Sequence, residues 1–439
     1  MRPMDASGYF RGKNVTLMRI GLLGRGVGDA RYLAAHGATV LVVDDAPQSV
    51  MQPSVDALKD VPNIRFKFGA YDLDDFRRCD LVLKGAGTPL DSSEIAEAHK
   101  HGIPVRMSAD LFAELSGATC IGVTGTRGKS TVAHMLHAIL TAAGKPVLLG
   151  GNVRGVSTLA FLDEATPEHI AVLELDSWQL QGFGEARISP HIAVFTTLYD
   201  DHLNYYKNDR AAYLADKANI FKFQTPNDTL IVGEQAVPAI EAQYPDALSR
   251  AVVADAATVP SDWRLAIPGE HNRYDAGLAL SAARALGSAD ETSRRALEAF
   301  RGVPGRLELV GEKGGVKIYN DTTETTPEAT LAALAALGPK RTVLIMGGAD
   351  KNLDMTALVA KIPEVKKTVL LSGTGTDRIK DQVSDSMIYH TLSEAVAAAL
   401  GAAENGDAVL FSPAFTSFGM FKNEYDRGDQ FNALVRALV

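Results

Sequence analysis

The chain has 439 residues, 46% hydrophobic and 22% charged, a composition typical of a globular protein with two or three domains. Its formal net charge of −9 and its pI near 5.6 argue against nucleic acid as a partner, because phosphate backbones are held by clustered lysine and arginine. Two cysteines, Cys79 and Cys120, exclude a disulfide scaffold and are expected to be buried apolar residues. No stretch resembles a membrane span or signal peptide, so we expect a soluble, cytoplasmic protein that does not bind membranes.

Short apolar runs alternate with helical patterns along the whole chain. The first series places an apolar run and glycine-rich turn at 15–24, a helix at 29–37, and strands at 38–45, 79–87 and 103–110. The second has buried strands at 118–125, 169–176 and 191–198, and the third at 315–321, 341–348, 367–373 and 407–414, with Ala-rich helices at 328–338 and 393–403. The sequence therefore predicts an α/β protein with three domains: Rossmann-like (1–108), P-loop ATPase-like with a mostly parallel sheet (109–303), and Rossmann-like again (304–439).

The N-terminal turn carries Gly24, Gly26 and Gly28, and Asp44 ends the following strand. This pattern approximates a dinucleotide-binding fingerprint, but its third glycine comes one position early. Binding of a nicotinamide cofactor, binding of another nucleotide and a purely structural turn all remain open from this motif alone.

A second glycine-rich segment, "GVTGTRGKST" at 122–131, follows an apolar run and opens a helical pattern. The common P-loop would place its first glycine at position 123, where this chain has valine. A strand, a turn and Lys129-Ser130 entering a helix would still direct backbone N–H groups and the helix dipole at a phosphate. The alternative to a phosphate site is an ordinary helix N-terminus with a solvent-exposed lysine.

Three further polar residues stand where a phosphate and metal site needs them. Glu174 closes a buried strand, His202 lies just past the next strand, and Lys217 follows fifteen residues later on an expected helix. A buried carboxylate needs a cation or hydrogen-bond donors. Taken singly, His202 would be a residue at a helix N-terminus and Lys217 a surface lysine.

Taken together, TGTxGKST, the strand-closing glutamate, D-H-L and the later lysine resemble the Mur ligase superfamily of ATP-dependent amide ligases, whose P-loop carries one extra residue. The resemblance continues through 150–155, 268–287, 302–310, 319–330, 344–354 and 410–431, and so spans nearly the whole chain. The small first domain and the length look most like the members that add glutamate to UDP-N-acetylmuramoyl-L-alanine in peptidoglycan precursor synthesis.

The resemblance implies an acyl-phosphate mechanism with ATP, two Mg²⁺ ions and a monomeric enzyme. The nucleotide would be held by Gly125, Thr126, Gly128, Lys129, Ser130, Thr131, Asn272, Arg306 and Asp321. Ser130 and Glu174 would bind one Mg²⁺, and His202 and a carbamylated Lys217 the other; Lys129, His202 and Lys217 would carry catalysis. The acceptor substrate would meet Gly24, Arg25, Asp44, Asn152, Asp176 and Ser177, and the incoming glutamate Lys351 and Ser417.

Two positions depart from the D-glutamate-adding pattern. Thr322-Thr323 stands where those enzymes usually have Ser-Lys, and Glu424 where they usually have Phe. The segments "GTRGKS" and "ELDSWQLQGF" also resemble a variant subfamily in which some members add L-glutamate. L-glutamate as the added amino acid, another Mur-type ligase, an NAD-dependent redox protein and a nucleotide-binding module without catalysis are the alternatives.

Overall fold

The computed structural model describes residues 6–202, 205–323, 325–383 and 387–438, with only the backbone of Ala6 and Ser7. The chain divides into two compact units: one contains the chain up to Ser261 together with Tyr274–Ala296, and the other contains Asp262–Arg273 together with Leu297 onward. The first unit holds two β-sheets and the second holds one. None of the described helices is long and apolar enough to cross a membrane.

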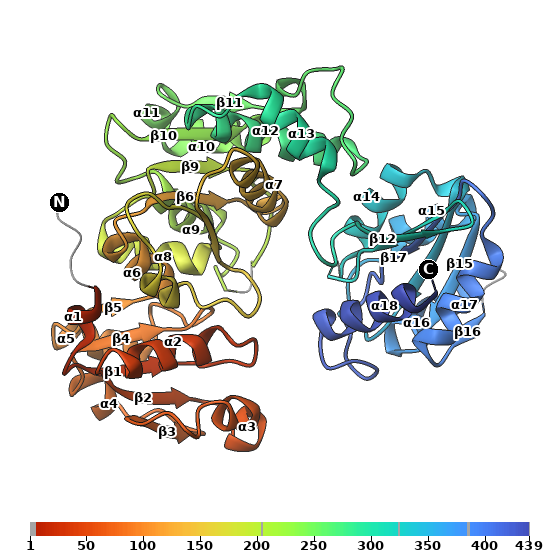
Figure 1. Ribbon diagram of the computed structural model, residues 1–439. Coiled ribbons are helices and arrows are strands. Elements are labelled where there is room, and N and C mark those ends of the chain that lie inside the picture. The colour runs from red at the N-terminus through yellow and green to blue at the C-terminus, as the bar shows by residue number, and fades with distance from the viewer. Residues whose placement is uncertain (1–5, 203–204, 324, 384–386, 439) are drawn as a thin grey trace. The chain divides into compact units, whose positions relative to one another are not determined.

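The first sheet has the strand order β3-β2-β1-β4-β5, and every pair is parallel. This is the order of a Rossmann-like fold, in which ligands bind outside the carboxyl ends of the strands. The strands are β1 (Asn14–Met18), β2 (Thr39–Asp44), β3 (Ile64–Phe68), β4 (Leu81–Lys84) and β5 (Val105–Arg106). The helices are α1 (Ala6–Phe10), α2 (Arg25–Ala35), α3 (Gln48–Asp56), α4 (Asp74–Arg77) and α5 (Ser93–Lys100), drawn in red and orange in Figure 1.

Two elements of this sheet differ from the sequence prediction. The strand expected at 103–110 has only two residues, because the backbone N–H of Met107 donates to Asp110 Oδ1 at 2.7 Å and helix α6 begins at Ser108. Strand β3 was not predicted. Its residues alternate between partly buried and exposed, as at the edge of a sheet, so it lacks a continuous apolar run.

The second sheet has the order β11-β10-β9-β6-β8-β7, and all of its pairs are parallel. Strand β6 lies between β9 and β8, so the residues that follow these three strands meet at one edge. The strands are β6 (Thr119–Thr124), β7 (Val147–Gly151), β8 (Ile170–Glu174), β9 (Ile192–Phe195), β10 (Thr229–Gly233) and β11 (Val252–Ala254). The helices of this part of the chain are α6 (Ser108–Leu115), α7 (Lys129–Ala142), α8 (Ser177–Ala186), α9 (Arg210–Lys217), α10 (Val237–Gln243), α11 (Pro245–Leu248), α12 (Glu270–Ala285) and α13 (Asp290–Ala299).

The third sheet has the order β12-β13-β17-β14-β15-β16 and is parallel except for β12, which pairs antiparallel with β13. Its strands are β12 (Glu308–Lys313), β13 (Val316–Asn320), β14 (Thr342–Gly347), β15 (Lys367–Leu371), β16 (Ile388–Tyr389) and β17 (Ala408–Phe411). The helices are α14 (Pro327–Leu337), α15 (Thr356–Lys361), α16 (Thr374–Ile379), α17 (Leu392–Ala402) and α18 (Glu424–Leu438). The predicted α/β class, with three mostly parallel sheets, is confirmed.

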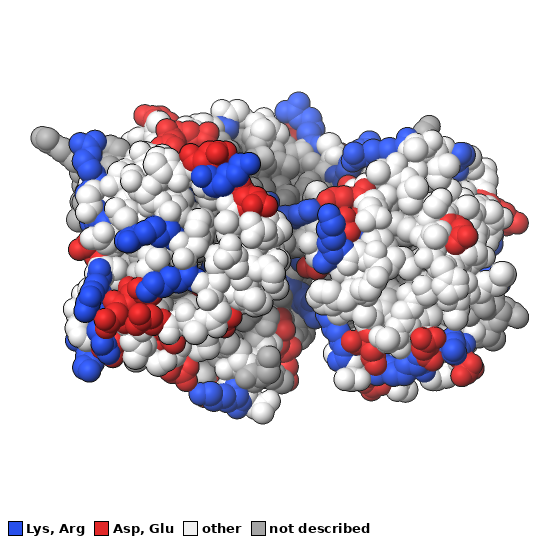
Figure 2. Space-filling view, turned by 90° about the horizontal axis from the view of Figure 1, so that it is seen from below, with Lys and Arg blue, Asp and Glu red and all other residues white. Residues whose placement is uncertain are grey.

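Both cysteines are buried, as predicted, and burial raises the pKa of the Cys120 thiol to about 12. On the face drawn in Figure 2, lysines and arginines are interspersed with aspartates and glutamates within each unit. Charge on that face is therefore mixed rather than gathered into one extended basic surface.

Candidate active site

The motif at 122–131 has the predicted strand–turn–helix form. Strand β6 ends at Thr124, and helix α7 starts at Lys129 after Gly128, whose φ of 84° is left-handed. The N-cap residue, Gly128, has no side chain that could cap α7, and the positive end of the helix faces the turn. In nucleotide-binding proteins, this is the arrangement of strand, turn and helix that binds phosphate.

The segment after β9 holds this turn in place. Thr197 accepts the backbone N–H of Thr126 on its carbonyl at 2.7 Å and that of Arg127 on Oγ1 at 2.9 Å. The Thr126 hydroxyl in turn accepts the backbone N–H of Tyr199 at 3.0 Å. Two chain segments about 70 residues apart therefore fix the backbone of the turn before any ligand binds.

Gly125 is required at the closest approach of these segments. Its φ is 142°, and a Cβ added there would lie 2.0 Å from Thr196 Oγ1 and 2.8 Å from the backbone nitrogen of Thr197. Real Cβ atoms do not come this near to other atoms, so only glycine fits without displacing the turn.

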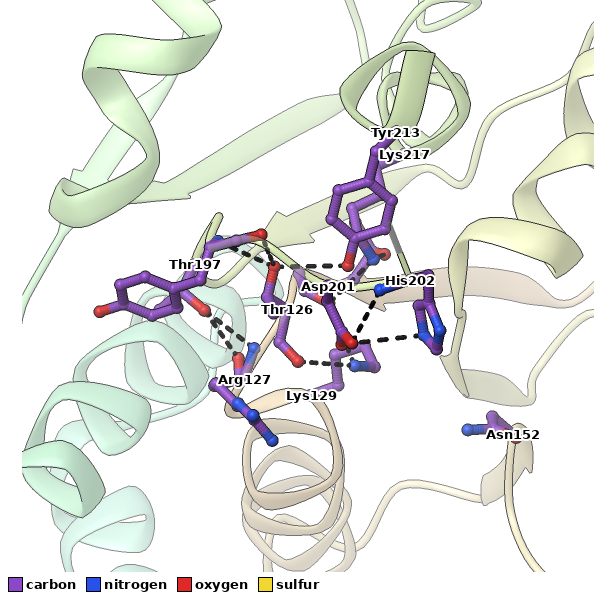
Figure 3. A network of polar contacts seen from close by, with 12 residues as sticks. Thr126, Arg127, Lys129, Asn152, Thr197, Asp201, His202, Tyr213 and Lys217 are labelled. Atoms are coloured by element: carbon purple, nitrogen blue, oxygen red, sulfur yellow. Dashed lines mark hydrogen bonds and ion pairs between the residues drawn. The ribbon is translucent and has the colours of Figure 1, made fainter. Parts of the chain in front are cut away.

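Two lysines approach the turn from opposite sides (Figure 3). Lys129 Nζ lies 3.1 Å from the Gly125 carbonyl oxygen, and Lys217 Nζ donates to the same oxygen at 2.9 Å. Lys217 is only 1% exposed, so its interpretation as a surface lysine is wrong. Burial, followed by the charge of Lys129, lowers the pKa of Lys217 well below its usual value of 10.5, which favours a neutral amine.

His202 lies beside this pair with a φ of 52°, and the next helix that the structure describes, α9, begins at Arg210. Its ring centroid is 4.5 Å from that of Trp178 and 6.3 Å from that of Tyr213. Burial lowers the pKa of the imidazole despite the opposing charge of Asp201, so the neutral, metal-binding form is favoured. Leu203, the third residue of the D-H-L motif, lies outside the described residues.

Glu174, at the end of β8, is linked to the N-terminal glycine turn through Asn152. Asn152 Nδ2 donates to Glu174 Oε1 at 3.3 Å, while its Oδ1 accepts from Arg25 Nη1 at 2.7 Å. The backbone N–H of Asn152 also donates to the Glu174 carbonyl at 2.7 Å. Sequence reasoning placed these three residues in one enzyme but did not predict their contact.

Asp176 and Ser177 open helix α8. Asp176 Oδ1 accepts the backbone N–H of Gln179 at 2.8 Å and so caps the helix, and Ser177 is 1% exposed. Their predicted contact with substrate stays a prediction. The observed role of Asp176 is to fix the start of α8 next to Glu174.

A cavity of about 470 Å³ opens between the first two sheets, within the first unit. Arg25 and Asp44 line it, whereas Gly24 is not among the lining residues, and the predicted contact of all three with the acceptor stays a prediction. Asp44 is 4% exposed and accepts the backbone N–H of Ala46 at 3.0 Å. The cavity lies near the carboxyl ends of β1, β2 and β4, where Rossmann-like sheets bind their ligands.

Lys84, the last residue of β4, also lines the cavity and was missed by the sequence analysis. It is 3% exposed, and its Nζ donates to the Thr88 carbonyl at 3.1 Å and to Gln181 Oε1 on α8 at 3.2 Å. Burial lowers its pKa to about 8, although nearby carboxylates, Asp176 foremost, oppose this effect. The available signal was a lysine closing a buried strand, the same pattern that singled out Glu174.

The remaining predicted residues belong to the second unit. Asp321 is 3% exposed and accepts the Leu307 backbone N–H at 2.9 Å and the Ser412 hydroxyl at 2.7 Å. Lys351 is exposed and donates to Thr325 Oγ1 at 2.6 Å. The other three are Ser417, which is buried, Asn272, whose Nδ2 donates to the Pro268 carbonyl at 2.6 Å, and Arg306, which is exposed.

Comparisons with known proteins show which family this chain belongs to. Residues 123–259 match the family described as the Mur ligase middle domain, and residues 305–415 match the Mur ligase, glutamate ligase domain. A protein of Roseiflexus sp. named UDP-N-acetylmuramoylalanine–D-glutamate ligase is 35% identical to this chain, and the match covers 98% of this chain and 99% of that protein. A protein of the same name from Geobacillus kaustophilus is 32% identical, and the match covers 95% of this chain and 97% of that protein.

Solved structures share the fold. UDP-N-acetylmuramate-alanine ligase from Thermotoga maritima matches 97% of this chain and all of its own, with a TM-score of 0.60 and 17% identity. The MurF ligase of the same organism, in complex with ADP, matches 84% of this chain and 98% of its own, with a TM-score of 0.55 and 18% identity. The full-length relatives, the two matching domains and the strand–turn–helix with its buried lysine show that this chain belongs to the Mur ligase family of ATP-dependent amide ligases.

Proposed function

We propose that this protein uses ATP to join glutamate to UDP-N-acetylmuramoyl-L-alanine, a step of peptidoglycan precursor synthesis. The observation that carries the proposal is the pair of lysines on the Gly125 carbonyl at the start of α7. Full-length relatives named as D-glutamate ligases of this acceptor support it.

The chemistry has two steps. The γ-phosphoryl group of ATP passes to the L-alanyl carboxylate, which gives ADP and an acyl phosphate. The glutamate amine then attacks the acyl carbon, loses a proton and expels phosphate, forming the amide. Both steps concentrate negative charge, so the protein must supply positive charge and orientation rather than a covalent nucleophile.

We assign Lys129 and the first turn of α7 to the phosphates. The Lys129 ammonium now contacts the carbonyls of Gly125 and Thr126, each at 3.1 Å, and these contacts keep it at the turn. Ser130 and Thr131 follow on the same helix end, where their backbone N–H groups would face a bound phosphate. Lys129→Ala should lower kcat/KM by several orders of magnitude, because transition-state charge is then uncompensated.

Two Mg²⁺ ions belong to this proposal. Bound between ATP and the acceptor, they would neutralise phosphate charge and polarise the reacting oxygens. We propose Ser130 and Glu174 for one ion and His202 with carbamylated Lys217 for the other. The donor set fits, because Glu174 is 4% exposed and its Oε1 accepts a hydrogen bond from an amide, that of Asn152, and because the lowered pKa of His202 favours the neutral imidazole.

Among the described residues, no group of three His, Cys, Asp or Glu side chains comes together as a metal site. A carbamate at Lys217 would supply the missing oxygen ligands. A neutral lysine amine adds to CO₂ and releases one proton, and burial supports this assignment because it lowers the pKa of Lys217 and so favours the neutral amine.

The carbamate can be tested directly. NMR of the protein in ¹³C-bicarbonate should show one carbamate signal that is lost in Lys217→Ala and kept in Lys222→Ala, an exposed lysine nearby. Lys217→Ala should also be nearly inactive and partly rescued by short carboxylates. A signal unchanged in Lys217→Ala would exclude the assignment.

The remaining assignments concern the substrates, and we keep the domain boundaries at 108 and 303. The cavity lined by Arg25 and Asp44 would take the UDP group, with the turn at Gly24 beside it, and its position between the first two sheets supports this. The acceptor would continue past Asn152, Asp176 and Ser177. In the second unit, ATP would use Asn272, Arg306 and Asp321, and glutamate would use Lys351 and Ser417.

We propose D-glutamate as the added amino acid, because the full-length relatives carry that name. Phosphate release from MgATP and the acceptor should be measured with D- and L-glutamate in parallel, with product masses and Lys129→Ala as the inactive control. Activity with L-glutamate alone would make Thr323 and Glu424 the specificity residues. Activity with neither would refute the proposed acceptor or amino acid.

We also propose that the enzyme works as a monomer in the cytoplasm, where ATP and UDP-linked sugars are available. Light scattering of the purified protein should give a mass near 46.8 kDa. Cell fractionation should recover it with cytoplasmic markers. A stable dimer, or recovery with membranes, would contradict these two points.

A further inference from the structure

Arg427 on α18 is the largest fully buried side chain of the described residues, with 0% exposure. Arginine is seldom fully buried unless it is paired with an acid. No described carboxylate lies within ion-pair distance of its guanidinium, and its Nε has no hydrogen-bond partner among the described residues. Within the part of the chain that the structure describes, this buried cation therefore has no neutralising carboxylate.

The guanidinium contacts two loops. Arg427 Nη2 donates to the Thr322 carbonyl at 2.7 Å, and Nη1 donates to the Phe415 carbonyl at 3.1 Å. Thr322 follows β13 and Phe415 follows β17, and these strands are parallel neighbours that pair Asn320 with Phe411. One side chain thus ties together the two segments that leave the carboxyl ends of adjacent strands.

The next residue, Gly428, allows this contact. A Cβ on Gly428 would lie 2.6 Å from Thr322 Oγ1, so glycine lets α18 approach the loop. Thr322 in turn is anchored by its backbone N–H, which donates to Asn320 Oδ1 at 3.0 Å. The Arg427-Gly428 pair is therefore fitted to the Thr322 loop by both shape and hydrogen bonds.

The charge persists at neutral pH. Burial lowers the pKa of the Arg427 guanidinium to about 10, and the charge of Glu424 partly opposes this. A buried charge without a counter-ion is costly, and an anion arriving nearby offsets that cost. The two loops lie at the carboxyl ends of the strands, the edge at which such sheets bind ligands.

We propose that Arg427 is a positioning residue for the incoming amino acid: it locks the loops of Thr322 and Phe415 together and presents to the carboxylates of glutamate a positive charge that no described carboxylate pairs. Asp321 and Ser417, which we assign to ATP and glutamate, lie one and two residues from the tethered carbonyls. The glutamate part of this inference rests on the proposed function. The locking of the loops does not.

The test compares Arg427→Met, Arg427→Lys and a matched control, Arg436→Met, which removes an exposed arginine from the last turn of the same helix. Methionine fills similar space without charge, and such replacements of buried charges are often tolerated by the fold. Lysine keeps the charge but not the two-point contact and provides a second variant if Arg427→Met does not fold.

Hydrogen exchange should be faster at residues 321–323 and 414–417 in both Arg427 variants, and unchanged in Arg436→Met. The KM for glutamate should rise about tenfold or more in Arg427→Met, the expected effect of losing hydrogen bonds to a charged group. The KM for glutamate should rise less in Arg427→Lys. The KM for the UDP-linked acceptor should change by no more than about twofold in either variant, which is less than the tenfold change expected when an interaction is lost.

Each outcome tests one part of the proposal, either the locking of the loops or the effect of the charge on glutamate. Unchanged exchange in both Arg427 variants overturns the locking role. Faster exchange with an unaltered KM for glutamate overturns the role of the charge. If the wild-type enzyme adds no glutamate, the proposed function fails, and hydrogen exchange still decides whether Arg427 locks the loops.

Discussion

Replacing Lys84 by methionine should change how the stability of the first unit depends on pH. Lys84 is buried at the edge of the cavity, and its pKa is lowered from 10.5 to about 8. Between these two values the unfolded chain binds more protons than the folded chain, so the free energy of unfolding must rise with pH. The full difference is about 3 kcal/mol, at about 1.4 kcal/mol for each tenfold change in proton affinity.

Between pH 7.5 and 9.5, Lys84 should raise the free energy of unfolding by about 2 kcal/mol. At pH 9.5 most folded molecules have released the Lys84 proton, whereas most unfolded chains still hold it. Urea unfolding of wild type, Lys84→Met and Lys100→Met at both pH values measures it. Lys100 is an exposed lysine with 72% of its side chain accessible, so its variant should follow wild type. If the free energy of unfolding of Lys84→Met changes with pH by the same amount as that of wild type, the argument that burial lowers the pKa of Lys84 is refuted.

Three further outcomes follow from the contacts of the first unit. Gly125→Ala should weaken ATP binding about tenfold or more, since the new Cβ would meet Thr196 Oγ1 and the strained backbone costs about 1–3 kcal/mol. Titration of the variant with an ATP analogue measures this, and an unchanged affinity would contradict it. Asn152→Ala should weaken Mg²⁺-dependent nucleotide binding by about tenfold because Glu174 loses its amide partner, whereas equal loss without Mg²⁺ would point to general damage. Cys120, with its pKa near 12, should resist iodoacetamide until the protein unfolds, and rapid labelling of the native protein would show that its burial is wrong.

The edges of the elements show the limits of sequence patterns. Apolar runs located the buried central strands β6, β8, β9, β14 and β17 because parallel strands covered on both faces carry continuous apolar residues. Strand β3 was missed because it is half exposed. Strand β5 was drawn too long because the Asp110 cap, rather than hydrophobicity, decides where α6 begins.

The sequence by itself determined the α/β class and the glycine-rich turn with its helix, because each depends on residues close together in the chain. It also determined the family, through several such local motifs spread along the chain. Tertiary structure decided the states of the polar residues. Lys217 is locally an ordinary helix residue, and its burial comes from tertiary contacts such as the hydrogen bond to Gly125, 92 positions away. The Arg25–Asn152–Glu174 link and the buried cation at Arg427 likewise join segments separated by at least 12 positions. Such contacts are set by how the sheets and helices pack, and packing brings together side chains whose spacing along the chain carries no signal.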